Sequence, residues 1–251
     1  MSGRLRVDLH SHTSFSPDAR TTPAQLVERA AEVGVDRIAV TDHGEIEGAL
    51  RAQALDPDRV IIGEEIRCRC RTELIGLFLR DRIPEKLPIE SVVEQIRDQG
   101  GLVYAPHPWA YLLRPGRHAR RAVAVADIVE VFNSRAFWGR WNRLAERSAV
   151  EAGRPAAASS DAHFPHEIGR AWTAVPSFDS AGTMLTALQD GAPVALATGS
   201  PVVHVASVSW RMARHIPLLP EIPREEAAPG LLRQVVSRRD DPAARGGPAI
   251  G

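Results

Sequence analysis

The chain has 251 residues, of which 44% are hydrophobic and 25% charged, so its composition is that of a globular protein long enough for one barrel-sized domain. Its 31 basic and 31 acidic side chains cancel, which argues against bulk binding of duplex nucleic acid through a chain-wide positive field. A short or single-stranded nucleotide substrate is still allowed, because a bound metal ion can provide positive charge locally.

Strands and helices are predicted to alternate along most of the chain. Thr22 and Pro23 have the pattern of an N-cap followed by the first helical residue, and Gly34 ends that helix. Further helices are expected from Pro88 and over residues 46–54, 138–152 and 181–189. Extended segments are expected at 5–9, 37–41, 60–62, 67–71, 74–79, 102–105, 128–132, 156–160, 171–175 and 194–197.

This alternation predicts parallel strand pairing with right-handed crossovers. About seven such units favour an α/β fold of a distorted (β/α)7-type, TIM-like barrel over residues 1–215. Residues 216–251 are rich in Pro and Arg and are expected to form a flexible tail. The polar N-terminus and the absence of an apolar run near ~20 residues predict no membrane association and a cytoplasmic location. Cys68 and Cys70 are expected to be free thiols.

Potential metal ligands follow the predicted strands. His10 and His12 are two residues apart, as are Asp161 and His163, so each pair points to one side of an extended segment. Asp42 and His43 are adjacent and point oppositely; we expect His43 to be the ligand and Asp42 to orient the loop. Because strand ends converge at the mouth of a barrel, this pattern indicates a multinuclear metal site.

These motifs resemble those of the PHP (polymerase and histidinol phosphatase) family of metal-dependent phosphoesterases, in the family's order over about residues 5 to 200. The Leu74–Leu79 and Glu130–Asn133 runs are similar to its stand-alone branch. The motifs that match the family are the paired histidines, Thr41-Asp42-His43-Gly44, Gly63-x-Glu65, His107-Pro108 and Asp161-x-His163. It implies a distorted barrel that holds two or three divalent ions (Mn, Zn or Fe).

The resemblance also implies how the ligands are shared. One ion would take His10, His12, Glu65 and Asp161; a second would share Glu65 and use His107; a third would take Asp18, His43 and His163. Glu73 stands near where many relatives supply a further histidine to the second ion, and it is alternatively an exposed turn carboxylate. Glu64 is the rival of Glu65, but the Gly-x-Glu register favours Glu65. His10, His12, Asp161 and His163 are the residues on which catalysis would depend.

The implied reaction is hydrolysis of a phosphoester by water that the metal cluster activates. Its substrate would be a small phosphomonoester, a nucleotide or an oligonucleotide end. Two alternatives stay open: a histidinol-phosphate phosphatase, and a metal-binding regulatory module without activity. An amidohydrolase-type reaction is less favoured, because Lys86, predicted in a loop, is the one lysine that could bridge two metals.

Substrate phosphate is expected to need fixed cations besides the metals. Arg135, Arg20 and Arg117 are the candidates, because an arginine fork matches a phosphate group. The cluster around Arg117 is alternatively a solvated loop. Asn133 is either a polar site residue or the N-cap of the next helix. The neighbouring aromatics either stack on a base or pack at the rim; they are Trp109, Tyr111, Phe137 and Trp138.

Overall fold

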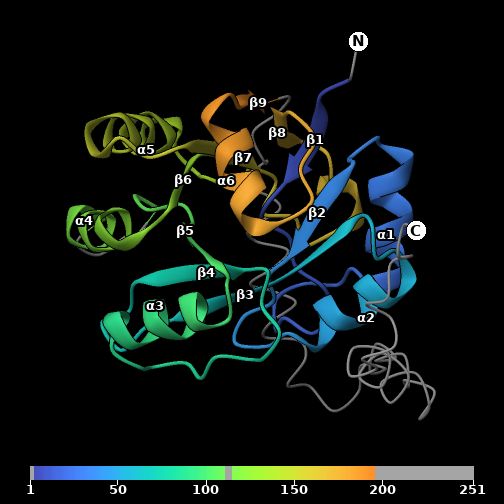
Figure 1. Ribbon diagram of the computed structural model, residues 1–251, viewed down its shortest axis with the longest axis horizontal. Helices are drawn as coiled ribbons and strands as arrows, with labels where there is room; N and C mark the ends of the chain where they lie inside the picture. Colours follow the sequence, from blue (N-terminus) through green and yellow to red (C-terminus); the bar gives the residue numbers. More distant parts are fainter. Residues whose placement is uncertain (1–2, 111–114, 196–251) are drawn as a thin grey trace, which may run out of the picture.

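The computed structural model describes residues 3–110 and 115–195, which form one nearly closed barrel of nine strands with helices around it (Figure 1). The strands are β1 (Leu5–Asp8), β2 (Arg37–Val40), β3 (Val60–Arg67), β4 (Glu73–Leu77), β5 (Leu102–Ala105), β6 (Ile128–Asn133), β7 (Ala156–Ser159), β8 (Ala171–Val175) and β9 (Ala192–Ala195). The α-helices are α1 (Pro23–Glu32), α2 (Glu47–Leu55), α3 (Ile89–Asp98), α4 (Pro115–Val125), α5 (Gly139–Ala152) and α6 (Ala181–Gln189), and η1 (Pro165–Glu167) is a short 3-10 helix.

The strand order is β7-β6-β5-β4-β3-β2-β1-β8-β9, which confirms a distorted TIM-like barrel. Parallel pairing holds within β1–β2–β3 and within β5–β6–β7. The distortion comes from β4, which is antiparallel to both neighbours, and from β8, which is antiparallel to β1 and β9. Because only five residues join β3 to β4, the chain reverses there as a hairpin and has no room for a crossover helix.

Beyond β1 and β7, the backbone closes the barrel at the end where the predicted ligands lie. Ser11 and Ala162 form an isolated parallel bridge. The amide of His12 donates to the carbonyl oxygen of Ala162 at 2.8 Å, and the amide of Asp161 donates to that of His10 at 2.9 Å. These two bonds bring the His10-x-His12 and Asp161-x-His163 segments side by side.

Two apolar clusters support this frame. One lies between the strands and the surrounding helices and includes Leu26, Ile62 and Ile96; the other includes Val7 and Tyr104 from the strands and continues into α6. The expected cap of α1 is confirmed, since the Thr22 side chain accepts from the Gln25 amide and Pro23 is the first helical residue. Both cysteines are free thiols, as predicted.

Three elements differ from the sequence predictions. The segment expected to be extended at 67–71 is, apart from Arg67, part of the loop between β3 and β4. Helix α4 covers the cluster around Arg117, so the alternative of a solvated loop there is wrong. The repeated arginines of the cluster hid an inward face of Ala119 and Ala122. Strand β3 continues to Arg67, so Glu65 lies inside a long strand and not after a short one. Residues 216–251 and Tyr111 lie outside the described residues. Among the helices of the described part, none is both long and apolar enough to cross a membrane.

Candidate metal centre

The centre is built around the carboxylate of Glu65, which four imidazole rings surround. Its Oε2 lies 3.4 Å from Nε2 of His10, 3.4 Å from Nε2 of His12 and 3.1 Å from Nδ1 of His43. Its Oε1 lies 3.3 Å from Nε2 of His107. Glu65 is 1% exposed. The segments after three strands, β1, β2 and β5, therefore meet on one side chain of β3.

Two aspartates complete the ring of carboxylates. Oδ1 of Asp161 lies 3.3 Å from Nε2 of His12 and 3.4 Å from Nδ1 of His163. Asp18 lies on the loop before α1, with Oδ1 3.5 Å from Nε2 of His163 and Oδ2 3.7 Å from Nε2 of His43. Eight of the nine predicted ligands thus converge, and Glu73 is close enough to Glu65 and His107 for their charges to affect its pKa.

Three groups within this ring offer one ligand atom each, all within 4.8 Å of one another: His12, His43 and His163; His10, Glu65 and His107; and His10, His12 and Asp161. Each group overlaps one of the three ligand sets that the sequence resemblance implied. Shared members link the groups, so this is the donor set of a polynuclear metal site.

Buried oxygen atoms without hydrogen bonds indicate whether these residues fit such ions. Both carboxylate oxygens of Glu65 and Oδ1 of Asp18 are buried and accept no hydrogen bond. His10 and His12 also bring their Nε2 atoms to 3.0 Å from each other. A buried acceptor without a partner is costly, and ligation of a cation removes that cost. The mixed nitrogen and oxygen donors therefore fit divalent metal ions.

Charge in the ring shifts the pKa values of its members. Burial alone would lower the pKa of His43 and of His107, but Glu65 raises the pKa of His43 to about 10 and that of His107 to about 9. Burial opposes ionisation of Glu65 and Asp161, yet the nearby imidazoles hold the pKa of both carboxyls well below the usual range. These carboxylates stay charged and available as ligands at neutral pH.

A chain of hydrogen bonds orients His12 from behind. Ser16 Oγ donates to Oδ1 of Asp42 at 2.8 Å, so it is left to accept from Nδ1 of His12 at 3.0 Å. Asp42 is buried and also accepts from the amide and hydroxyl of Thr13. This arrangement keeps the proton of neutral His12 on Nδ1 and turns Nε2 toward Glu65 and Asp161. Asp42 therefore has the orienting position expected for it.

Glu130, which the sequence analysis did not single out, occupies the equivalent position behind His10. Its Oε1 lies 3.2 Å from Nδ1 of His10, and its Oε2 accepts from the His107 amide at 2.5 Å. Nδ2 of Asn133 donates to Oε2 of Glu130 at 2.9 Å and to Oδ2 of Asp161 at 3.1 Å. The sequence could have indicated this role, because Glu130 stands within the apolar strand β6 and a buried carboxylate needs a partner.

The backbone at two of these residues adopts positive φ angles. His107 has a φ of 25° and Asp161 a φ of 53°. Such angles are uncommon for residues other than glycine and persist where surrounding contacts fix them. Those contacts are two hydrogen bonds. The backbone amide of His107 donates to the Glu130 carboxylate, and Nδ2 of Asn133 donates to the Asp161 carboxylate.

The predicted substrate-binding residues have different positions. Asn133 lies in the centre and is not a helix cap, because Trp138 is the N-cap of α5. Arg135 is 6% exposed, and its Nη1 donates to both oxygens of Glu167 at 2.8 Å. Arg20 is exposed, and its amide donates to the His163 carbonyl at the rim of the centre. Arg117 is exposed in the first turn of α4.

The side chains of Glu64 and Glu65 lie on opposite sides of β3, and only that of Glu65 faces the histidines. Oε2 of Glu64 accepts from the Ile83 amide at 2.8 Å, on the side of β3 that faces away from the histidines. Burial raises the pKa of Glu64 to about 8. The alternation of side chains along β3 thus assigns Glu65 to the centre and Glu64 to the loop after β4.

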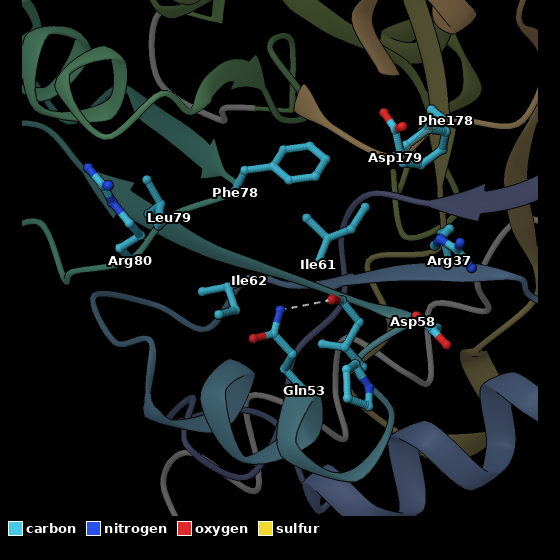
Figure 2. A pocket seen from close by; sticks show the side chains of 12 residues that line it. Arg37, Gln53, Asp58, Ile61, Ile62, Phe78, Leu79, Arg80, Phe178 and Asp179 are labelled. Carbon is cyan, nitrogen blue, oxygen red and sulfur yellow. Dashed lines mark hydrogen bonds between the residues drawn. The ribbon is translucent and has the colours of Figure 1, made fainter. Parts of the chain in front are cut away.

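A separate pocket of about 390 Å³ lies at the opposite end of the barrel, where β2 and β3 begin (Figure 2). Phe78, Phe178 and Ile61 form its apolar part, and Arg37 and Arg80 lie at its edges. None of the predicted metal ligands lines it. The metal centre is therefore a densely packed cluster of donors, distinct from this hollow.

Comparisons with known proteins agree with this geometry. The family described as PHP domain matches residues 8–100, and the one described as PHP-associated matches residues 139–193. One uncharacterized protein of Methanocaldococcus jannaschii is 33% identical over 160 residues, which cover 59% of this chain and 92% of that protein. A second from the same organism is 32% identical over 174 residues, covering 67% of this chain and 69% of that protein.

The fold also matches a solved structure. The crystal structure of a two-domain protein from Bacteroides vulgatus, described as containing a predicted PHP-like metal-dependent phosphoesterase, superposes with a TM-score of 0.63 at 19% identity. The match covers 82% of this chain and 69% of that one. The barrel, the buried clusters of His, Asp and Glu, and these similarities establish that the chain belongs to the PHP family, with a PHP domain followed by a PHP-associated part.

Proposed function

We propose that this protein is a metal-dependent phosphoesterase that uses two or three divalent ions held by the ring around Glu65. The observation that carries the proposal is that one buried carboxylate, without a hydrogen bond to either oxygen, stands within 3.4 Å of four imidazole nitrogens. A multinuclear cluster of this kind suits the attack of water on phosphorus. The natural substrate would be a small phosphomonoester, a nucleotide or an oligonucleotide end.

The residues of the chain prepare the centre for this chemistry. His10, His12, Glu65 and Asp161 would hold one ion, Glu65 and His107 a second, and Asp18, His43 and His163 a third. When bound, the ions would lower the pKa of water and neutralise the charge of the phosphate. Glu130 and the pair of Ser16 and Asp42 fix the ring tautomers of His10 and His12, so that a lone pair on each Nε2 faces the cluster.

The exposed side of the centre defines where substrate would enter. The side chain of His43 is 30% exposed, whereas those of His10 and His12 are fully covered. Phosphate would therefore approach over His43, His107 and Asp18. Arg20, whose backbone is fixed to His163, is the arginine of this edge that we propose to bind phosphate.

Elemental analysis combined with a phosphoester panel tests the proposal. The panel includes nucleoside 3′- and 5′-phosphates, a 3′,5′-bisphosphate, short oligonucleotides and histidinol phosphate. The purified protein should contain more than one divalent ion per chain and hydrolyse at least one class. His12→Ala should lose most metal and nearly all activity, whereas His166→Ala, at an exposed histidine outside the centre, should lose neither.

Two outcomes would redirect the proposal. Stoichiometric metal without hydrolysis of any panel member would favour the regulatory module. A strong preference for histidinol phosphate would assign that phosphatase activity instead of a nucleotide substrate.

A further inference from the structure

Helices α4 and α5 each turn a row of arginines to solvent. On α4 these are Arg117 and Arg120, three residues apart; on α5 they are Arg140, Arg143 and Arg147, spaced by three and four residues. Such spacing places residues on one face of a helix. The opposite faces pack inward through small apolar residues, including Ala119, Ala122, Ala145 and Ala149. Each helix is thus amphipathic, with arginines on its outer side, which on α5 also carries the exposed Glu146 and Glu151.

Among the described residues, no carboxylate forms an ion pair with these arginines. In the ranges that the structure covers, ion pairs of arginine involve Arg29, Arg51, Arg59, Arg97 and Arg135, and none from the outer faces of α4 or α5. Helix α4 contains no acidic residue, and the acidic residues of α5 lie in its second half, at Glu146 and Glu151. Because the whole chain is neutral, this is a local concentration of positive charge.

Aromatic rings extend the positive surface toward the barrel mouth. Phe137 is 54% exposed and Trp138 is 44% exposed, which is unusual for large apolar side chains. Their ring centroids are 5.9 Å apart, and Trp138 lies 6.1 Å from Trp141 with the planes inclined by 13°. The guanidinium of Arg140 lies 4.0 Å from the Trp138 ring. Rings and arginines therefore alternate on one rim.

The barrel topology joins this rim to the metal centre. Helix α4 follows β5 and His107, and α5 follows β6 and Asn133, so both helices start at the ligand end. Phe137 is four residues beyond Asn133, within about 14 Å of backbone. Figure 1 shows α4 and α5 side by side. Between them, Nε1 of Trp109 donates to Oγ of Ser148 at 3.0 Å, which links the end of β5 to α5.

We propose that this arginine–aromatic surface, formed by Arg117, Arg120, Phe137, Trp138, Arg140, Arg143 and Arg147, binds single-stranded nucleic acid and guides it to the metal centre. Arginines complement a phosphate backbone, and exposed rings stack on bases that are not paired. A duplex or an anionic membrane would use the charges but not the rings. The binding is independent of the proposed function; only the delivery of a strand for hydrolysis rests on it.

Binding is measured on the full-length protein by fluorescence anisotropy with a labelled 12-nucleotide single strand, the matching duplex and anionic phosphatidylserine vesicles. EDTA is present to prevent turnover. The single strand should bind at least about tenfold more tightly than the duplex, since unpaired bases add stacking to the phosphate contacts. Its affinity should fall with salt, with a slope of about 0.7 per phosphate contact.

The variants separate this surface from the rest of the protein. Arg143→Ala and Arg120→Ala should each weaken single-strand binding about fivefold at 0.1 M salt. Trp138→Ala should weaken it about tenfold, and Trp138→Phe should retain most of the affinity. Arg80→Ala is the matched control, because Arg80 is an exposed arginine at the opposite end of the barrel. It should bind as the wild type does.

Each outcome decides the proposal. Equal or tighter binding of duplex, binding of vesicles but not of oligonucleotides, or equal losses in Arg80→Ala and Arg143→Ala would each overturn it. Hydrolysis of bis(p-nitrophenyl) phosphate is measured in parallel in the presence of Mn²⁺. Surface variants should keep that activity, so a failure of binding and a failure of the proposed phosphoesterase are told apart.

Discussion

The guanidinium of Arg135 and the carboxylate of Glu167 form a buried ion pair that fixes the turn carrying His163. Nη1 of Arg135 donates to both oxygens of Glu167 at 2.8 Å, and the two side chains are 6% and 0% exposed. Oε2 of Glu167 also accepts from the amides of His163 and Phe164 at 3.0 Å each. The pair therefore helps to hold His163, a proposed metal ligand, in position.

Removing one partner of this pair should be costly, because the other is left as an unpaired buried charge. We expect Arg135→Ala to reduce the free energy of unfolding by about 3–5 kcal/mol. It should also lower the metal content through displacement of His163. Urea denaturation and elemental analysis check both effects. The exposed arginine variant Arg80→Ala should change neither.

A phosphate-binding role for Arg135 predicts a different pattern. In that case the metal content and the free energy of unfolding would stay near those of the wild type, and KM for phosphoesters would rise. Measuring KM and metal content on the same preparation decides between the two roles.

Glu65→Gln should remove more than one ion from each chain, because the same carboxylate approaches His10, His12, His43 and His107. The substitution keeps the shape and removes the negative charge that balances the cations. Elemental analysis gives the stoichiometry directly.

Glu64→Gln is the matched control for this change. Glu64 is adjacent and buried, but it accepts from the Ile83 amide, and its pKa of about 8 keeps it largely protonated at neutral pH. A neutral amide should therefore replace it with little effect on metal content. Equal metal loss in both variants would contradict the assignment of Glu65.

Glu130→Gln should weaken metal binding or activity about 10- to 100-fold while the barrel stays folded. The carboxylate of Glu130 accepts from the His107 amide and faces Nδ1 of His10, so its loss disturbs the orientation of two ligands. Metal titration monitored by calorimetry gives the affinity. Glu94→Gln, at an exposed position of α3, should leave it unchanged.

Metal binding should release protons and strengthen as the pH rises. The pKa values of His43, about 10, and His107, about 9, mean that both rings are protonated at neutral pH without an ion. Calorimetric titration with Zn²⁺ in buffers of different ionisation enthalpy measures the protons released. A binding enthalpy that is independent of the buffer would contradict this expectation.

The same shifts predict how the stability of chelator-treated protein depends on pH. Both folded-state pKa values lie above the ordinary histidine value of 6.5, so the protonated rings stabilise the fold fully below about pH 6.5. That contribution is lost as the pH rises through about 9 to 10. Thermal unfolding in EDTA should therefore shift to lower temperature over this window, whereas metal-loaded protein should not show this loss.

Local rules were sufficient for much of the fold. The boundaries of β5, β8 and α6 and the cap at Thr22 agree with the patterns of apolar residues, Gly, Pro and Thr, because these depend on neighbours in sequence. The spacing of His10 and His12, and of Asp161 and His163, likewise predicted ligands on one side of a strand, and both pairs lie in the centre.

What the sequence determined by itself was therefore the set of donor residues and the alternating α/β order. The tertiary structure alone decided that Glu130 stands behind His10 and that Arg135 faces Glu167. These relationships join residues 32 to 120 positions apart. No local pattern encodes such contacts, because a buried charge is satisfied by whichever partner the closed barrel brings within hydrogen-bonding distance.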